Sequence, residues 1–243
     1  MSFPDTAHVE SSSAASLEDS PGELRKEILY LSIDCETDGP VPGLYSCLSI
    51  GLCGFNLIGE IVWEREVNLF PLDDAAQDRR TMDWWAQPEQ RDAYLHLLKQ
   101  RQDPKETFIR LSEEIKDLKR TYRVFTVAWP SGFDWAFINY YFYRFVGENP
   151  LGRSAKCAQS YAWALARTMH PNVSIQPLLD GWADDRFPHT HKALDDAREQ
   201  GAKFINMLRE ATKNGKHYRL GGNKKKHVPK GTGVNTSPFR HAK

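Results

Sequence analysis

Residues 27–35, EILYLSIDC, form an apolar run that leads directly into Glu36, and this run constrains the fold more than any other part of the chain. In a β-strand, successive side chains point to opposite faces of the sheet. Asp34 and Glu36 then share one face, while Cys35 lies on the other and packs in a core. A carboxylate at the end of a buried strand is costly unless it is paired, hydrogen-bonded or bound to a metal. The run therefore predicts a two-sided sheet and a partner for the acid pair elsewhere in the chain.

The rest of the chain changes its hydrophobic period from strand-like to helix-like and back. A short connection joins the second and third strand-like runs, which predicts an antiparallel pair. Such a succession is typical of an α/β fold with one mixed sheet flanked by helices. The predicted strands after the first are residues 45–55, 60–70 and 122–129, and the predicted helices are residues 105–121, 133–145, 157–169 and about 190–212.

A chain of 243 residues with 40% hydrophobic residues can bury the core of one domain, which we place at residues 24–212. Residues 1–23 hold five acids and no Lys or Arg, and we predict a disordered acidic tail. Residues 213–243 hold nine Lys or Arg and no acid, and we predict a disordered basic tail. That tail either keeps the protein in solution or binds phosphates without sequence preference.

No segment approaches the ~20 consecutive apolar residues that a membrane helix needs, and the N-terminus lacks the pattern of a signal peptide. We therefore expect a soluble, cytoplasmic protein with no membrane partner. The four cysteines show no C-x-x-C spacing and mostly lie inside apolar runs. This argues against a zinc site and against a disulfide framework, and it favours packing in the core.

Two further segments carry acids at the starts of predicted helices. Asp134 follows a strand and opens an apolar helix, where the helix dipole alone would favour an acid. His189 and His191 precede a helix whose first turns contain Asp195 and Asp196. Both aspartates lie away from the apolar stripe of that helix, so spacing alone does not choose between them.

Taken in order, IDCETDG, CLSIGL, GFDWAF and HKALDDA resemble the motifs of the DEDDh exonucleases, the DnaQ-like superfamily that includes RNase T and oligoribonuclease. The resemblance covers about residues 27–210. It implies a ribonuclease H-like fold, with a mixed five-stranded sheet flanked by helices. It also implies hydrolysis of nucleic acid from the 3′ end towards the 5′ end. The MDWW segment, with Trp84 and Trp85, resembles a small prokaryotic and phage-borne subgroup of exoribonucleases close to the mycobacterial type.

Carried over to this chain, the metal-binding acids of the family fall on Asp34, Glu36, Asp134 and Asp196, and its general base falls on His191. The five-residue step from His to Asp in the family is what selects Asp196 over Asp195 and His191 over His189. Four crowded carboxylates repel one another unless cations neutralise them, and oxygen ligands prefer Mg²⁺ or Mn²⁺. Two such ions could clamp a scissile phosphate. The chain departs from the H-N-x-x-F-D pattern of the second motif, since it reads AWPSGFD.

Three residues are predicted to contact substrate. Trp84 and Trp85 either pack beneath a short helix or form a platform on which a terminal base stacks. Thr37 follows Glu36, and the backbone there could contact the 3′-terminal nucleotide, as in related enzymes.

The resemblance implies a metal-dependent 3′-5′ exonuclease that releases 5′-mononucleotides from single-stranded RNA or DNA, with RNA favoured. A homodimer is kept open as its assembly. The alternatives are an exodeoxyribonuclease, a hydrolase of small nucleotides, and a catalytically silent module that only binds nucleic acid. The complete set of acids argues against the silent module, because a binding module has no need of four costly carboxylates.

Overall fold

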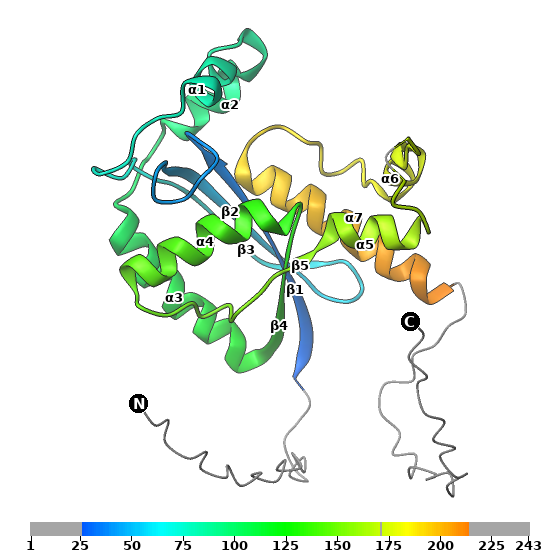
Figure 1. Ribbon diagram of the computed structural model, residues 1–243. Helices are drawn as coiled ribbons and strands as arrows, with labels where there is room; N and C mark the ends of the chain where they lie inside the picture. The colour runs from blue at the N-terminus through cyan, green and yellow to red at the C-terminus, as the bar shows by residue number, and fades with distance from the viewer. Residues whose placement is uncertain (1–25, 171, 214–243) are drawn as a thin grey trace, which may run out of the picture.

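The computed structural model describes residues 26–170 and 172–213. Its centre is one mixed sheet with the strand order β3-β2-β1-β4-β5 (Figure 1). The strands are β1 Glu27–Thr37, β2 Cys47–Phe55, β3 Ile61–Asn68, β4 Tyr122–Ala128 and β5 Lys156–Cys157. The pairs β1/β2 and β2/β3 are antiparallel, whereas β1/β4 and β4/β5 are parallel. The predicted five-stranded mixed sheet is confirmed.

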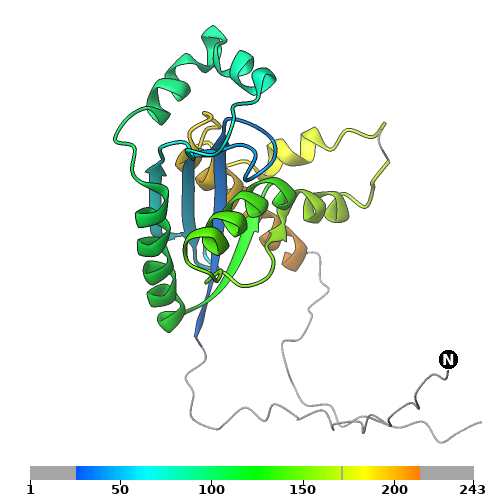
Figure 2. The same cartoon turned by 60° about the vertical axis from the view of Figure 1, so that its left-hand side comes forward.

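Helices cover both faces of this sheet. In the two views, α3 and α4 lie over one face and α5 and α7 over the other, while α1 and α2 extend beyond one end of the strands (Figures 1 and 2). The helices are α1 Arg79–Trp85, η1 Pro88–Gln90, α2 Arg91–Leu97, α3 Pro104–Thr121, α4 Ser131–Phe145, α5 Ala158–Leu165, α6 Gln176–Trp182 and α7 Ala193–Lys213.

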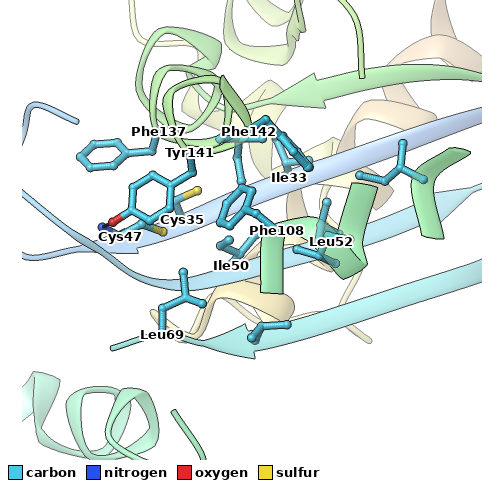
Figure 3. Packing of buried hydrophobic residues seen from close by; sticks show 14 of the residues in the cluster. Ile33, Cys35, Cys47, Ile50, Leu52, Leu69, Phe108, Phe137, Tyr141 and Phe142 are labelled. Carbon is cyan, nitrogen blue, oxygen red and sulfur yellow. Dashed lines mark hydrogen bonds between the residues drawn. The ribbon is translucent and has the colours of Figure 1, made fainter. Parts of the chain in front are cut away.

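The face beneath α3 and α4 carries the largest hydrophobic cluster, part of which is shown in Figure 3. Ile33 and Cys35 of β1 point into it, as the alternation predicted, and both are buried. Phe108 of α3 packs against Tyr141 of α4, with ring centroids 5.1 Å apart. The Tyr141 hydroxyl accepts a hydrogen bond from the main-chain N–H of Cys47 at 2.8 Å, so this buried polar group is satisfied.

The opposite face of β1 packs against α7, the long amphipathic helix. Gly201 of α7 lies so close to the sheet that a Cβ atom there would stand 2.3 Å from the ring of Phe55 and 3.0 Å from Cβ of Ser32. Glycine therefore permits the close approach of helix and sheet. Ser32, Asp34 and Glu36 share this face. The close packing therefore places Asp34 and Glu36 near the start of α7.

Two predicted helices have wrong boundaries. The predicted helix 157–169 ends at Leu165 and begins only after β5, because Lys156 and Cys157 pair with β4 at the sheet edge and Arg167 has a left-handed φ of 54°. The last helix begins at Ala193 and not at Thr190 or His191. His191 has a left-handed φ of 56°, and the backbone there turns around the side chain of Asp196. The sequence predicted α1 only as the short helix of the packing alternative for Trp84 and Trp85, and it did not predict α2 or α6.

All four cysteines are free, and Cys35, Cys47 and Cys53 are buried, which confirms packing for these three. Within residues 26–170 and 172–213, no helix is long and apolar enough to cross a membrane. The two predicted tails lie outside the described residues, apart from Lys213, which ends α7. The domain boundaries stay a prediction.

Candidate active site

A pocket of about 420 Å³ opens where the end of β1, the start of α4 and the first turns of α7 meet. It contains all four acids that the motifs predict, Asp34, Glu36, Asp134 and Asp196, and both histidines, His189 and His191. Asp34 and Glu36 arrive from β1 on the α7 face. Asp134 lies in the first turn of α4, and Asp196 lies in the first turn of α7. The fold thus brings together residues that lie up to 162 positions apart in the sequence.

Carboxylate oxygens of Asp34, Glu36 and Asp196 lie within 4.8 Å of one another. Asp34 and Asp196 are almost completely buried, and Glu36 is half-buried. Gln200, one turn after Asp196 on α7, donates its side-chain N–H to Oδ1 of Asp34 at 2.6 Å. This amide fixes the orientation of Asp34 and supplies no positive charge.

Asp134 is 2% exposed and approaches the same pocket from the other side of β1. Its Oδ1 accepts a hydrogen bond from the main-chain N–H of Cys35 at 3.1 Å, which ties the start of α4 to β1 between the two acids of the first motif. Its Oδ2 is buried with no hydrogen-bond partner in the described structure. A buried carboxylate oxygen without a partner is costly, so the site favours a cation or a donor at this position.

The electrostatics of the pocket reflect crowded negative charge. Burial raises the pKa of Asp34 well above its usual value, and the charges of Asp134, Glu36 and Asp196 raise it further. Burial likewise raises the pKa of Glu36, with contributions from Asp196 and Asp134. Burial raises the pKa of Asp134 to about 8. Such a set of acids is stable in the charged form only when a positive group joins it.

The structure distinguishes Asp196 from Asp195, which spacing could not. The main-chain N–H groups of Thr190 and His191 donate to the two carboxylate oxygens of Asp196 at 2.8 and 3.1 Å. Asp196 faces the acid cluster, whereas Asp195 accepts from the Thr190 hydroxyl at 2.9 Å and pairs with Arg198 at 3.1 Å. Arg198 also pairs with Glu64 of β3 at 2.7 Å. Asp195 therefore anchors the start of the helix to the sheet.

Both histidines reach the pocket, and the sequence had set His189 aside. Nδ1 of His189 lies 3.2 Å from Oδ2 of Asp196, and the rings of His189 and His191 are 4.5 Å apart. Burial and the charge of His189 lower the pKa of His191, which favours its neutral ring. The role of His191 as general base stays a prediction.

The paired tryptophans of α1 occupy different environments. Trp85 is 2% exposed, and its indole N–H donates to the main-chain carbonyl of Thr37 at 2.9 Å. This burial leaves no free face for a base, so the packing alternative describes Trp85 and the stacking alternative does not. Trp84 is half-buried and meets the ring of His191 edge to face, with centroids 5.0 Å apart.

Thr37 is also buried, and its hydroxyl donates to the carbonyl of Gly39 at 2.9 Å. Its side chain is engaged within the loop that follows β1. A contact between Thr37 and substrate therefore stays a prediction for the backbone of this segment.

Sequence reasoning missed several residues that line the pocket. Gln200 lies four residues after Asp196, so helical periodicity placed both on one face and was the signal that could have found it. Lys203 follows at a similar angle, seven residues after Asp196, and also lines the pocket. Trp129 lines it from the β4–α4 connection, and Phe133 lines it from the first turn of α4. Because aromatic residues usually lie in the core, the sequence alone does not mark Trp129 as a pocket residue.

The residues present fit divalent cations. Their donors are carboxylate oxygens of Asp34, Glu36, Asp134 and Asp196, the hard ligands that Mg²⁺, Mn²⁺ and Ca²⁺ prefer. The unpartnered Oδ2 of Asp134 and the mutual repulsion of the acids both call for positive charge. Cysteine does not contribute, since Cys35 points to the opposite face of β1.

The fold is a ribonuclease H-like sheet, and four acids and a histidine from three parts of the chain meet where its first strand ends. This combination defines a nuclease of the DEDDh type. The comparisons agree. Residues 29–208 match the family described as the 3′-5′ exoribonuclease Rv2179c-like domain. The chain is also 32% identical over 202 residues to the 3′-5′ DNA exonuclease Cap18 of Escherichia coli, covering 77% of this chain and 96% of the relative. The chain therefore belongs to the Rv2179c-like family, and it is a 3′-5′ exonuclease.

Solved structures show the same fold at low sequence identity. The nuclease domain of 3′hExo, a DEDDh family member bound to rAMP, aligns with a TM-score of 0.57 and 12% identity, covering 76% of this chain and 93% of that one. E. coli Exonuclease I in complex with a dA16 oligonucleotide aligns with a TM-score of 0.50 and 14% identity, covering 79% of this chain and 44% of that one. These matches confirm the predicted fold class. DEDDh exonucleases use divalent metals, and the acid cluster offers the matching ligands.

Proposed function

We propose that this exonuclease removes 5′-mononucleotides one at a time from the 3′ end of single-stranded nucleic acid, with two divalent cations held by Asp34, Glu36, Asp134 and Asp196. The observation that carries this proposal is the cluster of Asp34, Glu36 and Asp196 oxygens within 4.8 Å, beside the unpartnered Oδ2 of Asp134. Mg²⁺ and Mn²⁺ both suit the set of ligands. When bound, such ions activate water and stabilise the charge that develops on the phosphate.

The side chains of the chain itself prepare the reaction. Gln200 orients Asp34, and the main-chain N–H of Cys35 orients Asp134. The main-chain N–H groups of Thr190 and His191, which precede α7, orient Asp196. His191 takes the proton from the attacking water on a ring nitrogen. The ring of His191 lines the pocket and packs edge to face against Trp84. His189 is the competing candidate, because its Nδ1 lies 3.2 Å from Oδ2 of Asp196.

Single-stranded DNA is our first candidate substrate. The supporting observation is the relative that is 32% identical over nearly its whole length and is described as a DNA exonuclease. RNA is the second candidate, because the family is described as an exoribonuclease domain and the motifs resemble exoribonucleases. The solved structure of E. coli Exonuclease I holds a DNA oligonucleotide, which agrees with a single-stranded substrate.

The test is incubation of 5′-labelled single-stranded DNA and RNA oligomers of one sequence with Mg²⁺, Mn²⁺, Ca²⁺ or EDTA. We expect ladders that shorten from the 3′ end, 5′-mononucleotides as products, and no cleavage in EDTA. A 3′-phosphorylated oligomer and a duplex with blunt ends serve as controls. Failure of the pure protein to shorten any oligomer with any metal would refute the proposal, and retained binding without cleavage would favour the silent module. Light scattering of the same preparation determines whether the protein is a monomer or a homodimer.

A further inference from the structure

A second pocket, of about 450 Å³, lies directly beside the catalytic pocket. The two pockets share three lining residues, Trp129, Gln176 and Leu179. A nucleic-acid strand that leaves the catalytic pocket across Trp129 therefore enters the second pocket. This pocket lies between α5 and the segment that leads into α6. In both views these helices are on the opposite side of the molecule from α1, which carries Trp84 (Figures 1 and 2). The second pocket is therefore separate from the Trp84 side of the site.

The lining of the second pocket differs sharply from that of the first. None of the described residues that line it carries a charge, whereas the first pocket contains five acids. Two tryptophans come from different parts of the chain, Trp129 from the connection after β4 and Trp163 from α5. Two primary amides, Gln159 and Gln176, stand beside them. Flat aromatic faces together with amide donors and acceptors match a nucleobase, which is planar, uncharged and rich in hydrogen-bonding groups along its edge.

A positively charged side chain lies at the boundary between the two pockets. Lys203 of α7 lies with Nζ 5.5 Å from the centre of the Trp129 ring, and it forms an ion pair with Glu199. Among the described residues that line either pocket, Lys203 is the sole Lys or Arg. A strand whose terminal phosphodiester lies at the acid cluster places its next phosphate one nucleotide away, where a positive side chain offsets the repulsion from the acids. Lys203 lies on the path towards the second pocket.

We propose that the second pocket binds the base of an internal nucleotide of the substrate strand, upstream of the nucleotide that is removed. Trp129 and Trp163 contact the faces of the base, Gln159 and Gln176 contact its edge, and Lys203 contacts the adjoining phosphate. The binding is tolerant of sequence, because every base has an aromatic face. This subsite rests on the proposed function, and it predicts a minimum substrate length greater than a dinucleotide.

The test uses the Asp134→Asn variant with Mn²⁺, so that substrate binds and stays intact. The probes are single-stranded oligomers, of the sugar that the wild-type protein cleaves, with one abasic nucleotide moved stepwise from the 3′ end. We expect one internal position, within the last few nucleotides, at which loss of the base weakens binding by about tenfold. Adding Trp163→Ala should weaken binding of the intact oligomer and remove this position dependence, while Trp163→Phe should keep it. A Trp63→Ala change, in a half-buried tryptophan of the distant edge strand β3, is the matched control.

Trp163 also packs against a hydrophobic cluster that includes buried residues of α5, α6 and α7, so Gln159→Ala is a second variant that spares the aromatic packing. We expect it to reduce the effect of the same abasic position. Lys203→Met should make the plot of log affinity against log salt less steep, by about the amount that one phosphate contact contributes to its slope. The subsite is refuted if abasic positions all act alike, or if the position dependence survives Trp163→Ala in a folded protein. Absence of binding and cleavage in the wild-type protein would instead refute the proposed function.

Discussion

Gly51 of β2 lies directly beneath Ala193, the first residue of α7: a Cβ atom at Gly51 would stand 1.9 Å from the carbonyl oxygen of Ala193. Gly51 is also the residue that pairs with Asp34 across the β1/β2 ladder. The missing side chain therefore lets the start of α7 rest on the sheet beside the first motif. Asp196, three residues into the helix, reaches the acid cluster because of this contact. The glycine of CLSIGL is thus part of the architecture of the site.

We predict that Gly51→Ala destabilises the protein and lowers its activity by more than its loss of stability explains. Overpacking of a core usually costs about 1–3 kcal/mol, and here the obstruction is backbone, which cannot turn away. The measurements are the free energy of unfolding in urea and the metal-dependent cleavage rate at a temperature where the variant is folded. Gly181→Ala in α6 is the control, since a Cβ there meets nothing within 4 Å. Equal stability of the two variants would contradict the prediction.

The environments of Asp195 and Asp196 predict opposite outcomes for two neighbouring changes. Asp196→Asn should lower the cleavage rate by more than about 100-fold, because even changes outside the direct ligands of a metal cost about 10–100-fold. Asp195→Asn should keep most of the activity, because the amide oxygen can still accept from Arg198, the amide NH2 can donate to the Thr190 hydroxyl, and neither contact reaches the acid cluster. Calorimetric titration with Mn²⁺ should show weaker metal binding for Asp196→Asn alone. A reversed pattern would mean that Asp195 and not Asp196 serves the site.

Trp84 is predicted to position His191. Its ring meets His191 edge to face at 5.0 Å and meets Trp85 at 4.6 Å, and Trp85 is anchored by its hydrogen bond to Thr37. Trp84→Ala should lower kcat by about 10- to 100-fold, the size of effect that a small misplacement of a catalytic group produces. KM should change little, and Trp84→Phe should restore most of kcat. A rise in KM with unchanged kcat would instead indicate that Trp84 stacks on a base.

Sequence reasoning predicted the framework well, because strand alternation and helical periodicity are local properties. It placed Cys35 in the core and the Asp34–Glu36 pair on the opposite face, and the structure has both. The fifth strand was implied only by the family resemblance, and the hydrophobic pattern did not locate β5 because two residues at a sheet edge carry no periodic signal. It missed the true start of α7 because Thr190 and His191 donate to Asp196, a contact that competes with helix formation.

The choice of Asp196 rested on a family resemblance, and the geometry now supplies a physical reason for it. The division of labour between Trp84 and Trp85 could not be predicted, since it depends on which side of a short helix faces β1. The second pocket was also out of reach. Its walls come from Trp129 just after β4, from α5 and from residues 172–179, and no periodic signal links these segments in the sequence.

Cys157 is predicted to be the reactive thiol of the described structure. Burial opposes ionisation, but hydrogen bonds from Ser160 and Ser131 lower the pKa of Cys157 to about 7. Burial raises the pKa of Cys35 well above its usual value and that of Cys53 to about 12. Iodoacetamide at about pH 7.5 should therefore label Cys157 first, with a rate that rises between about pH 6 and 8 as the thiolate forms. Peptide mass spectrometry measures this, and faster labelling of a buried cysteine would contradict it.

The acid cluster predicts an unusual dependence of stability on pH when metal is removed by EDTA. The pKa of Asp134 is raised to about 8, and those of Asp34 and Glu36 are raised too, whereas the unfolded chain has carboxyl values near ~4. The folded state therefore binds more protons than the unfolded state between about pH 4 and 8, so the free energy of unfolding falls as pH rises through this range. Each loss of about 1 kcal/mol should lower Tm by about 2–4 °C. Mn²⁺ should restore Tm most strongly near pH 8, where the carboxylates are charged, and Asp134→Asn should flatten the profile in EDTA. A Tm in EDTA that rises steadily from about pH 5 to 8 would show that these acids are not crowded and buried as the structure has them.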